Sequence, residues 1–160
     1  MRTLVISDVH SNFEALRSVT ENVLYDEIIF LGDAINYGPQ PLEVLDWIHE
    51  NVKYRILGNH DNSFLMGQDP NCSLQTRDMA LYTMKNITEK LLGNEDKNKL
   101  RNFKESIDTK IDGERVLMAH GSPYDDFFGY TYGKEAEIIS TDKDLEKFSY
   151  ILLGHTHTSQ

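Results

Sequence analysis

The feature that most constrains the fold is the alternation of short apolar runs with amphipathic segments over the first third of the chain. Apolar runs typical of buried strands occupy Thr3–Ser7, Glu27–Leu31 and Val52–Leu57. A capping-box pattern at Ser11 and Glu14 predicts a helix after the first run, with Phe13, Leu16, Val19 and Val23 on its core face. Pro41 is well suited to begin a second helix. This β-α-β-α-β order predicts a parallel sheet with right-handed crossovers.

The rest of the chain predicts helices followed by a second sheet. Leu74 to Leu92 has helical periodicity, and another helix begins at Asn94. Asp112-Gly113 is a strong hairpin signal between the apolar runs Thr109–Ile111 and Arg115–Ala119. Thr141 with Asp144 predicts a last short helix, and Ser149 to Leu153 a final strand.

Together these elements predict an α/β fold in which two sheets form a β-sandwich flanked by helices. No repeat, linker or low-complexity tract divides the 160 residues, so we expect a single domain over residues 1–160. The helical segment at about 74–106 is expected to be an insert in that domain.

Composition excludes several classes of function. The chain has 16 Lys and Arg against 26 Asp and Glu, a net charge of -10, which argues against binding to duplex nucleic acid or to an anionic membrane. The longest apolar runs are strand-sized, and the N-terminus reads as a strand rather than a leader. The lone cysteine, Cys72, cannot form an internal disulfide. These observations predict a cytoplasmic protein.

Polar residues capable of chemistry follow five of the predicted strands. Five of the six histidines, with three aspartates and one asparagine, fall in these positions: Asp8, His10, Asp33, Asn59, His60, Asp61, His120, His155 and His157. In α/β sheets the working residues gather beyond the carboxyl ends of the strands, so we expect these side chains to converge. A single histidine in such a position is more often structural, but five converging with carboxylates favour a metal site.

The spacing of the candidates supports metal binding. In Asp8-x-His10 and His155-x-His157, alternate residues of an extended segment share one face. A donor set of carboxylate, amide and imidazole without thiolate suits Mn, Fe, Ni, Co or Zn with open positions. Seven such ligands are more than one ion would use.

These blocks resemble the calcineurin-like metallophosphoesterases. The resemblance rests on Asp8-x-His10, Gly32-Asp33, Gly58-Asn59-His60-Asp61, His120 and Gly154-His155-x-His157, in this order over nearly the whole chain. The segment from Gly32 to Pro41 is similar to the small prokaryotic phosphodiesterase and phosphatase branch. The family usually continues with further strands of the second sheet, so we expect that sheet either to be truncated at Gln160 or to be completed in another way, such as by a partner chain.

The resemblance implies a set of residue roles. Asp8, His10 and His157 would hold one divalent ion, Asn59, His120 and His155 a second, and Asp33 would bridge them. Manganese is the first choice for both ions, with Ni, Fe, Co and Zn as alternatives. A hydroxide bridging two ions ~3.5–4 Å apart would attack the phosphorus in line.

His60 and Asp61 are implied as catalytic residues rather than ligands. An imidazolium at His60 would face the leaving-group oxygen, and Asp61 would orient its ring. Asp61 is equally well suited to cap the following helix. The implied substrate is a phosphodiester or phosphomonoester of a small organic phosphate. The chain could also assemble with copies of itself into a homo-oligomer.

Two other functions compete with this prediction. A protein phosphatase or dinucleoside polyphosphate hydrolase would use the same residues. A binding scaffold of the same fold would be expected to lose ligands or His60, and this chain keeps them all.

Residues 124–133 hold five aromatic side chains directly after His120. This segment predicts a wall or lid beside the metal site, with the three tyrosines exposed and able to stack on a base or aryl leaving group. The alternative is a loop that buries Phe127 and Phe128 in the core.

Overall fold

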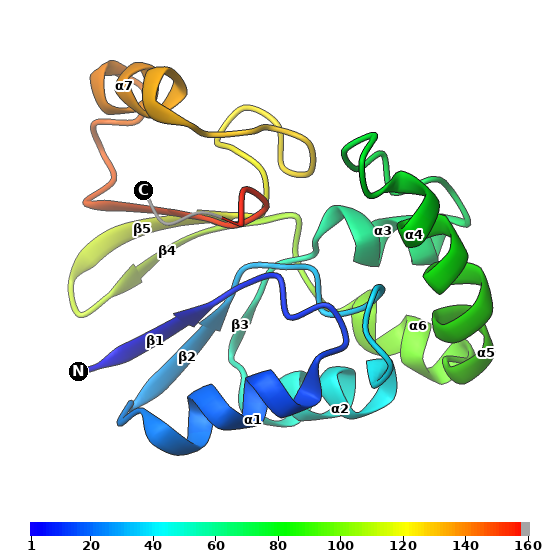
Figure 1. The fold of residues 1–160 in the computed structure, drawn as a ribbon. Helices are drawn as coiled ribbons and strands as arrows, with labels where there is room; N and C mark the ends of the chain where they lie inside the picture. Colours follow the sequence, from blue (N-terminus) through cyan, green and yellow to red (C-terminus); the bar gives the residue numbers. More distant parts are fainter. Residues whose placement is uncertain (158–160) are drawn as a thin grey trace.

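In the computed structural model, which describes residues 1–157, two sheets lie between helical layers (Figure 1). The first sheet is parallel, in the order β1-β2-β3, with β1 over Thr3–Ile6, β2 over Glu27–Phe30 and β3 over Tyr54–Arg55. Helices α1 (Phe13–Asn22) and α2 (Pro41–Asn51) cover its outer face. The predicted β-α-β-α-β unit is confirmed.

The second sheet contains β4 (Ser106–Ile111), β5 (Glu114–Ala119) and β6 (Tyr150–Leu153), in that order. β4 and β5 form the predicted antiparallel hairpin, and Asp112 and Gly113 both have positive φ at its turn. β6 pairs in parallel with β5. The predicted α/β two-sheet architecture flanked by helices is confirmed.

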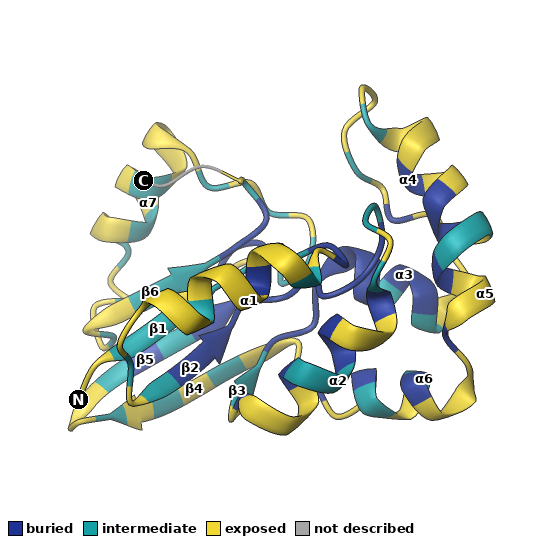
Figure 2. Ribbon diagram, turned by 60° about the horizontal axis from the view of Figure 1, so that its bottom comes forward, coloured by how far each residue is buried: buried dark blue, intermediate teal, exposed yellow. Residues whose placement is uncertain are grey.

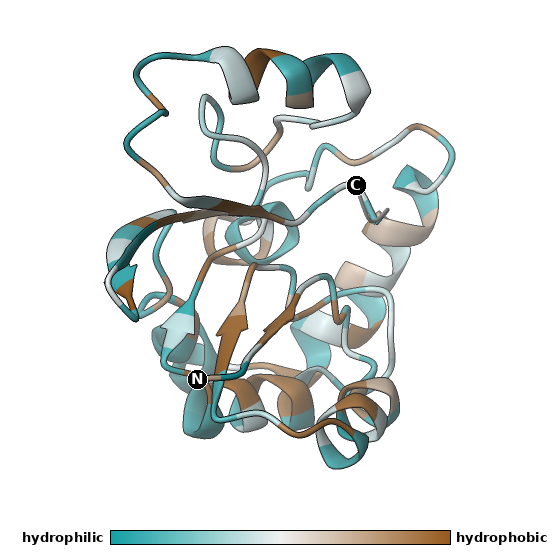
Figure 3. Ribbon diagram, turned by 90° about the vertical axis from the view of Figure 1, so that its left-hand side faces the viewer, coloured by the Kyte–Doolittle hydropathy of each residue, from teal (hydrophilic) through white to brown (hydrophobic). Residues whose placement is uncertain are grey.

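The central strand β2 explains how the two sheets are held together. Alternate side chains of a strand point to opposite faces. Ile28 and Phe30 therefore pack toward α1 and α2, whereas Ile29 and Leu31 pack against the second sheet. In Figure 3 the hydrophobic colouring is concentrated on strands in the middle of the molecule.

The middle of the chain is helical, as predicted. The helices after β3 are α3 (Asn59–Met66), α4 (Arg77–Thr83), α5 (Glu89–Leu91) and α6 (Asn94–Leu100). A π-helical turn over Met84–Thr88 joins α4 to α5, and Leu74 lies outside the helix and is exposed. Within residues 1–157, the structure contains no helix that is both long enough and apolar enough to cross a membrane.

The predicted capping box of the first helix is wrong. Asn12 is the N-cap, and its side chain accepts a hydrogen bond from Ala15 N at 3.0 Å. Ser11 instead donates its backbone N–H to Ala34 O, with a left-handed φ of 57°. The predicted core face is also too wide, since Val19 and Val23 are exposed. Figure 2 shows most of α1 in the colour of exposed residues.

The predicted last helix is displaced. Helix α7 spans Gly133–Thr141 and ends, rather than begins, at Thr141. The Thr141 hydroxyl donates back to Glu137 O, and Asp142 accepts a hydrogen bond from Asp144 N. These contacts form a turn of the kind that Asp favours, and the helix does not continue through it.

Candidate metal centre

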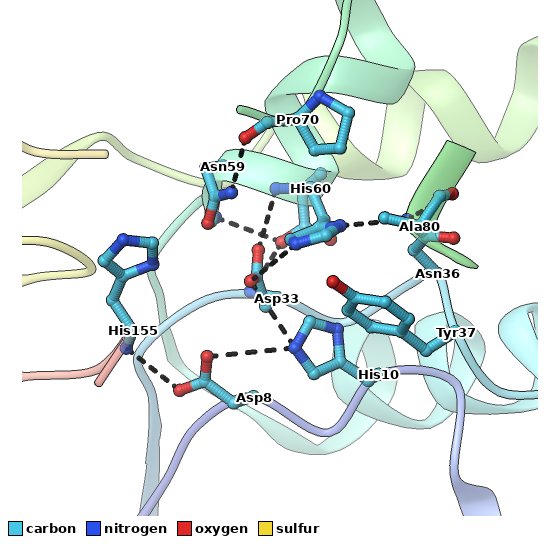
Figure 4. A network of polar contacts seen from close by, with 12 residues as sticks. Asp8, His10, Asp33, Asn36, Tyr37, Asn59, His60, Pro70, Ala80 and His155 are labelled. Atoms are coloured by element: carbon cyan, nitrogen blue, oxygen red, sulfur yellow. Dashed lines mark hydrogen bonds and ion pairs between the residues drawn. The ribbon is translucent and has the colours of Figure 1, made fainter. Parts of the chain in front are cut away.

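The predicted site residues lie together at one end of the two sheets (Figure 4). They come from loops after β1, β2, β5 and β6 and from the start of α3, which follows β3. Three groups have ligand atoms within 4.8 Å of one another: Asp8, His10 and His157; His10, Asp33 and His60; and Asp33, His120 and His155. The convergence expected from the sequence is therefore present in the structure.

Asp33 lies at the centre of this cluster and is almost completely buried. Its Oδ1 accepts a hydrogen bond from the backbone N–H of His60 at 2.9 Å. Its Oδ2 faces three imidazole nitrogens, at 3.4 Å from His120, 3.6 Å from His10 and 4.0 Å from His60. Burial opposes ionisation of Asp33, but these rings hold its pKa well below the usual range.

His120 connects the second sheet to Asp33. Its Nδ1 donates to Leu31 O at 2.7 Å, which directs Nε2 into the cluster. There Nε2 lies 3.0 Å from Asn59 Oδ1 and 3.4 Å from Asp33 Oδ2. Burial opposes a charge on His120, but Asp33 and Asp8 raise its pKa to about 9.

Asn59 is held in the orientation that a ligand oxygen requires. Its Nδ2 donates to Pro70 O at 2.7 Å (Figure 4). Its Oδ1 therefore points toward His120 Nε2, at 3.0 Å. In a neutral His120, the Nε2 lone pair would face two oxygen acceptors, which is unfavourable without a cation between them. Either a proton or a metal ion satisfies this arrangement.

Asp8 connects the first sheet to the loop after β6. Its Oδ2 accepts hydrogen bonds from Ser7 Oγ and from the backbone N–H of His155 at 3.1 Å. Its Oδ1 lies 3.1 Å from His157 Nε2 and 4.0 Å from His10 Nε2. Burial would raise the pKa of Asp8, but the contact with His157 and other neighbours lower it.

The histidine nitrogens around Asp8 are arranged as a ligand set. His10 Nδ1 lies 3.2 Å from Ile35 O, a contact that leaves Nε2 facing His157 Nε2 at 3.3 Å. His155 Nε2 is buried and has no hydrogen-bond partner within the part of the chain that the structure describes. Burial and the neighbouring His120 lower the pKa of His155 to about 4, which leaves a neutral ring with a free lone pair. Such a donor fits a divalent metal.

The loops of the cluster have unusual backbone conformations. Five predicted ligands have left-handed φ values between 47° and 67°: Asp8, His10, Asp33, His155 and His157. For residues other than glycine, each such conformation costs roughly 1–3 kcal/mol of conformational free energy. These conformations are concentrated at functional sites. The sequence pattern carries no signal for this feature.

Glycine is required at two positions beside Asp33. A Cβ on Gly58 would lie 2.1 Å from Asp33 Oδ1, and one on Gly32 would lie 2.6 Å from His120 Nδ1. Gly32 also has a φ of 100°. Both positions therefore let the loops approach closely around the central carboxylate.

His60 lies beside the cluster with its ring fixed by Asn36. Asn36 Nδ2 lies 2.9 Å from His60 Nδ1 and donates to Ala80 O at 3.1 Å, while its Oδ1 accepts from Thr83 Oγ1. Since these contacts direct the amide N–H toward His60, Nδ1 is the acceptor and the ring proton lies on Nε2. Burial lowers the pKa of His60 to about 4, which favours a neutral ring that donates through Nε2.

The predicted contact between Asp61 and the His60 ring is absent. Asp61 instead accepts hydrogen bonds from the backbone N–H groups of Gly58, Asp33, Ala34 and Ile35 at 3.0–3.2 Å. Burial and the Asp33 charge raise the pKa of Asp61, and the hydrogen bonds from Gly58, Ala34 and Ile35 oppose that rise. Asp61 thus caps α3 and fixes the loop after β2, which agrees with the capping alternative.

Sequence reasoning assigned no role to Asn36 or Tyr37. Asn36 is completely buried, and the Tyr37 ring contacts the rings of His10 and His60, with centroids 4.8 and 4.9 Å apart. Both follow Asp33 in the same strand-end loop. In the sequence, the one feature that could have indicated a role for these two residues is an amide followed by an aromatic ring so soon after Asp33.

Comparison with known proteins agrees with the geometry of the cluster. The family model for calcineurin-like phosphoesterase matches residues 1–159. The chain belongs to this family. Its two-sheet fold, and the divalent metal ions that the family implies, are consistent with the Asp and His groups described above.

Relatives within the family cover different shares of the chain. The uncharacterized protein MJ0912 of Methanocaldococcus jannaschii is 28% identical over 157 residues, which is 96% of this chain and 61% of that protein. A symmetrical bis(5'-nucleosyl)-tetraphosphatase of Buchnera aphidicola is 43% identical over 68 residues, 38% of this chain and 24% of that enzyme. The chain therefore spans about three fifths of the first relative's length and a quarter of the second's.

A solved structure extends the comparison to three dimensions. The metallophosphoesterase from Sphaerobacter thermophilus is 29% identical to this chain, with a TM-score of 0.74. The superposition covers 98% of this chain and 61% of that one. The sandwich described above is thus shared with a member of the same family.

Proposed function

We propose that this chain is a dinuclear metal-dependent phosphoesterase that hydrolyses a phosphodiester or phosphomonoester of a small organic phosphate. The observation that carries the proposal is the convergence of buried imidazole nitrogens and carboxylates whose lone pairs face one another. His155 Nε2, without a hydrogen-bond partner within residues 1–157, is the clearest example. A cluster of this kind on a family scaffold favours an enzyme over a binding scaffold.

The proposed ligands divide into two sets. Asp8, His10 and His157 would hold one ion, Asn59, His120 and His155 the other, and Asp33 would serve both. When bound, two divalent ions would act as Lewis acids on a phosphate oxygen and make water a stronger nucleophile. The oxygen and nitrogen donor set favours manganese, with Ni, Fe, Co and Zn as alternatives.

His60 is the proposed catalytic residue outside the ligand sets. Its Nε2–H, fixed by Asn36, would donate a hydrogen bond to the leaving-group oxygen as negative charge develops there. Asp61 would act indirectly, because its four backbone hydrogen bonds fix the loop that carries Asp33. We treat Asp61 as a positioning residue.

A second candidate is hydrolysis of a dinucleoside polyphosphate. Five of the relatives are named symmetrical bis(5'-nucleosyl)-tetraphosphatases, four of them matched over fewer than 70 residues and one over 137.

We also propose that residues 1–160 form one metallophosphoesterase domain with a helical insert at 74–106. A cytoplasmic location and the absence of duplex nucleic-acid partners stay predictions of the sequence.

The test is hydrolysis of an aryl phosphodiester, an aryl phosphomonoester and diadenosine tetraphosphate with Mn, Ni, Co, Mg or Zn. We expect His60→Ala to keep its bound metal while turnover falls about 100-fold or more, the range for loss of an acid–base group. Bound metal is measured by elemental analysis after dialysis. His49→Ala is the matched control, because His49 is exposed on α2.

Three outcomes would contradict parts of the proposal. Metal binding without turnover on any ester would favour a binding scaffold. Joint loss of metal and turnover in His60→Ala would make His60 a ligand. Turnover confined to diadenosine tetraphosphate would favour the second candidate.

A further inference from the structure

A hollow of about 370 Å³ opens beside the metal cluster, and we call it the aromatic hollow because Tyr37, Tyr130 and Tyr132 line it. Asp33, His60, His155 and His157 also line it, so it is continuous with the proposed reaction site. Its volume lies within the range of pockets for small ligands, roughly 300–1,000 Å³. A group attached to the reacting phosphate would therefore extend into this space.

Two stacked tyrosines line the aromatic hollow. The rings of Tyr130 and Tyr132 are nearly parallel, at 8°, with centroids 5.9 Å apart. Tyr130 also contacts the ring of His155, with centroids 4.3 Å apart. Both tyrosines are nevertheless about two-fifths exposed. The fold therefore leaves part of each ring open to a ligand.

Other residues of the aromatic hollow are uncharged. Cys72 and Met79 supply polarisable sulfur atoms, and Ser73 and Thr76 supply hydroxyl groups. No lysine or arginine is among the described residues that line it. Arg77, next to Thr76, pairs with Asp69 through Nε at 2.9 Å. A tail of additional phosphates would therefore find no cation there to replace water.

We propose that the aromatic hollow binds an uncharged planar leaving group, such as a nucleoside or an aryl alcohol, on a substrate with one reacting phosphate. This inference rests on the proposed function. In the reaction, a water oxygen bonds to phosphorus, the bond from phosphorus to the leaving-group oxygen breaks, and the leaving alcohol takes up one proton from water. Tyr130 and Tyr132 are then specificity-determining residues that stack on the leaving group.

The test compares two monoesters, 1-naphthyl phosphate with a planar aromatic leaving group and n-butyl phosphate with a flexible aliphatic one. Each variant is compared with the wild type on the same ester, so that the difference in leaving-group acidity cancels. With the metal-loaded protein, we expect Tyr130→Leu and Tyr132→Leu to raise KM for the naphthyl ester about 5–100-fold, the range found when a stacking ring is removed. KM for the butyl ester should stay within about twofold. Tyr130→Phe and Tyr132→Phe keep the ring and should behave as wild type.

A binding measurement separates failure of this inference from failure of the proposed function. The fluorescence of 1-naphthol is titrated with the metal-loaded protein, its leucine variants and Tyr124→Leu, a control in the same loop whose ring does not line the hollow. We expect weakened binding in the Tyr130 and Tyr132 variants only, even if no ester is hydrolysed.

Three results would contradict the inference. The first is equal KM changes for the naphthyl and butyl esters in the leucine variants. The second is 1-naphthol binding that is absent, or unaffected by the loss of both rings. The third, more efficient hydrolysis of diadenosine tetraphosphate than of the naphthyl ester, would contradict a substrate with one phosphate.

Discussion

The two sheets differ in the helices that cover them. Their strands are buried alike: the central strands β2 and β5 each have three buried residues, and the edge strands β1, β3, β4 and β6 have none. Over the first sheet, α2 contributes Pro41, Val44, Leu45 and Ile48 to the core, whereas α7, beside the second sheet, contributes no buried residue. A groove of about 780 Å³ separates α7 from β6, lined in part by Ala136, Ile139 and Ile151.

The half whose covering helix has no buried residue nevertheless supplies three of the seven proposed ligands. His120 follows β5, and His155 and His157 follow β6, whereas Asp8, His10, Asp33 and Asn59 belong to the first half. Each proposed ion would therefore contact both halves. The comparison indicates that the first sheet folds around its own core, while the far end of the second sheet depends more on the site.

The largest effect is expected from Asp33→Asn, which alters the residue on which both halves converge. We expect weaker binding of both ions and a loss of turnover of about 1,000-fold, since metal activation supplies several kcal/mol and 1.36 kcal/mol is tenfold in rate. Metal content after dialysis and initial rates measure the two effects. Asp144→Asn, the same change at an exposed position, is the control. Unchanged binding of either ion would contradict the bridging role.

A matched pair of isoleucines tests the difference in burial directly. Ile48 on α2 is fully buried, whereas Ile138 on α7 is 59% exposed. Ile48→Ala should lower the free energy of unfolding by about 2–5 kcal/mol, and Ile138→Ala by about 0.5 kcal/mol or less. Urea unfolding of both variants measures these values. Similar losses would show that α7 packs more tightly than the structure indicates.

Removal of metal by chelation should give the smallest of the three effects. At a free metal concentration of 10 times Kd, loss of each of the two ions costs about 1.4 kcal/mol, and loss of both corresponds to a fall in Tm of about 5–10 °C. Amide hydrogen exchange should accelerate more in β6 than in β2, because β2 lies inside its own core. Equal acceleration in both strands would contradict the proposed dependence of the second half on the site.

Most of the fold could be predicted because its strands and helices are encoded locally. The apolar runs at β1, β2 and β6 and the Asp112-Gly113 turn are short-range signals. The limits of α7 could not be predicted, since Thr141 and Asp144 are equally suited to begin a helix or to form the turn after one. The side chain that caps α1 likewise depended on Ser11 pairing with Ala34, a contact between distant parts of the chain.

The composition of the site was predictable, but its internal contacts were not. Ordered blocks of Asp, Asn and His at strand ends indicate which residues converge, because parallel strands end at one edge of a sheet. The partner of His60 depends on loop geometry, and Asn36 rather than Asp61 reaches its ring. Asp61 turns to four backbone N–H groups that the sequence does not reveal.

The left-handed backbone at five proposed ligands bears on how this chain can evolve. At each of these positions glycine would relieve the backbone, at the expense of a donor atom. Selection for stability alone would therefore favour substitution by glycine at five positions: Asp8, His10, Asp33, His155 and His157. The aspartate and histidine at these positions mark the places where activity and stability are in conflict, and a stabilising screen without an activity filter should lose the site first.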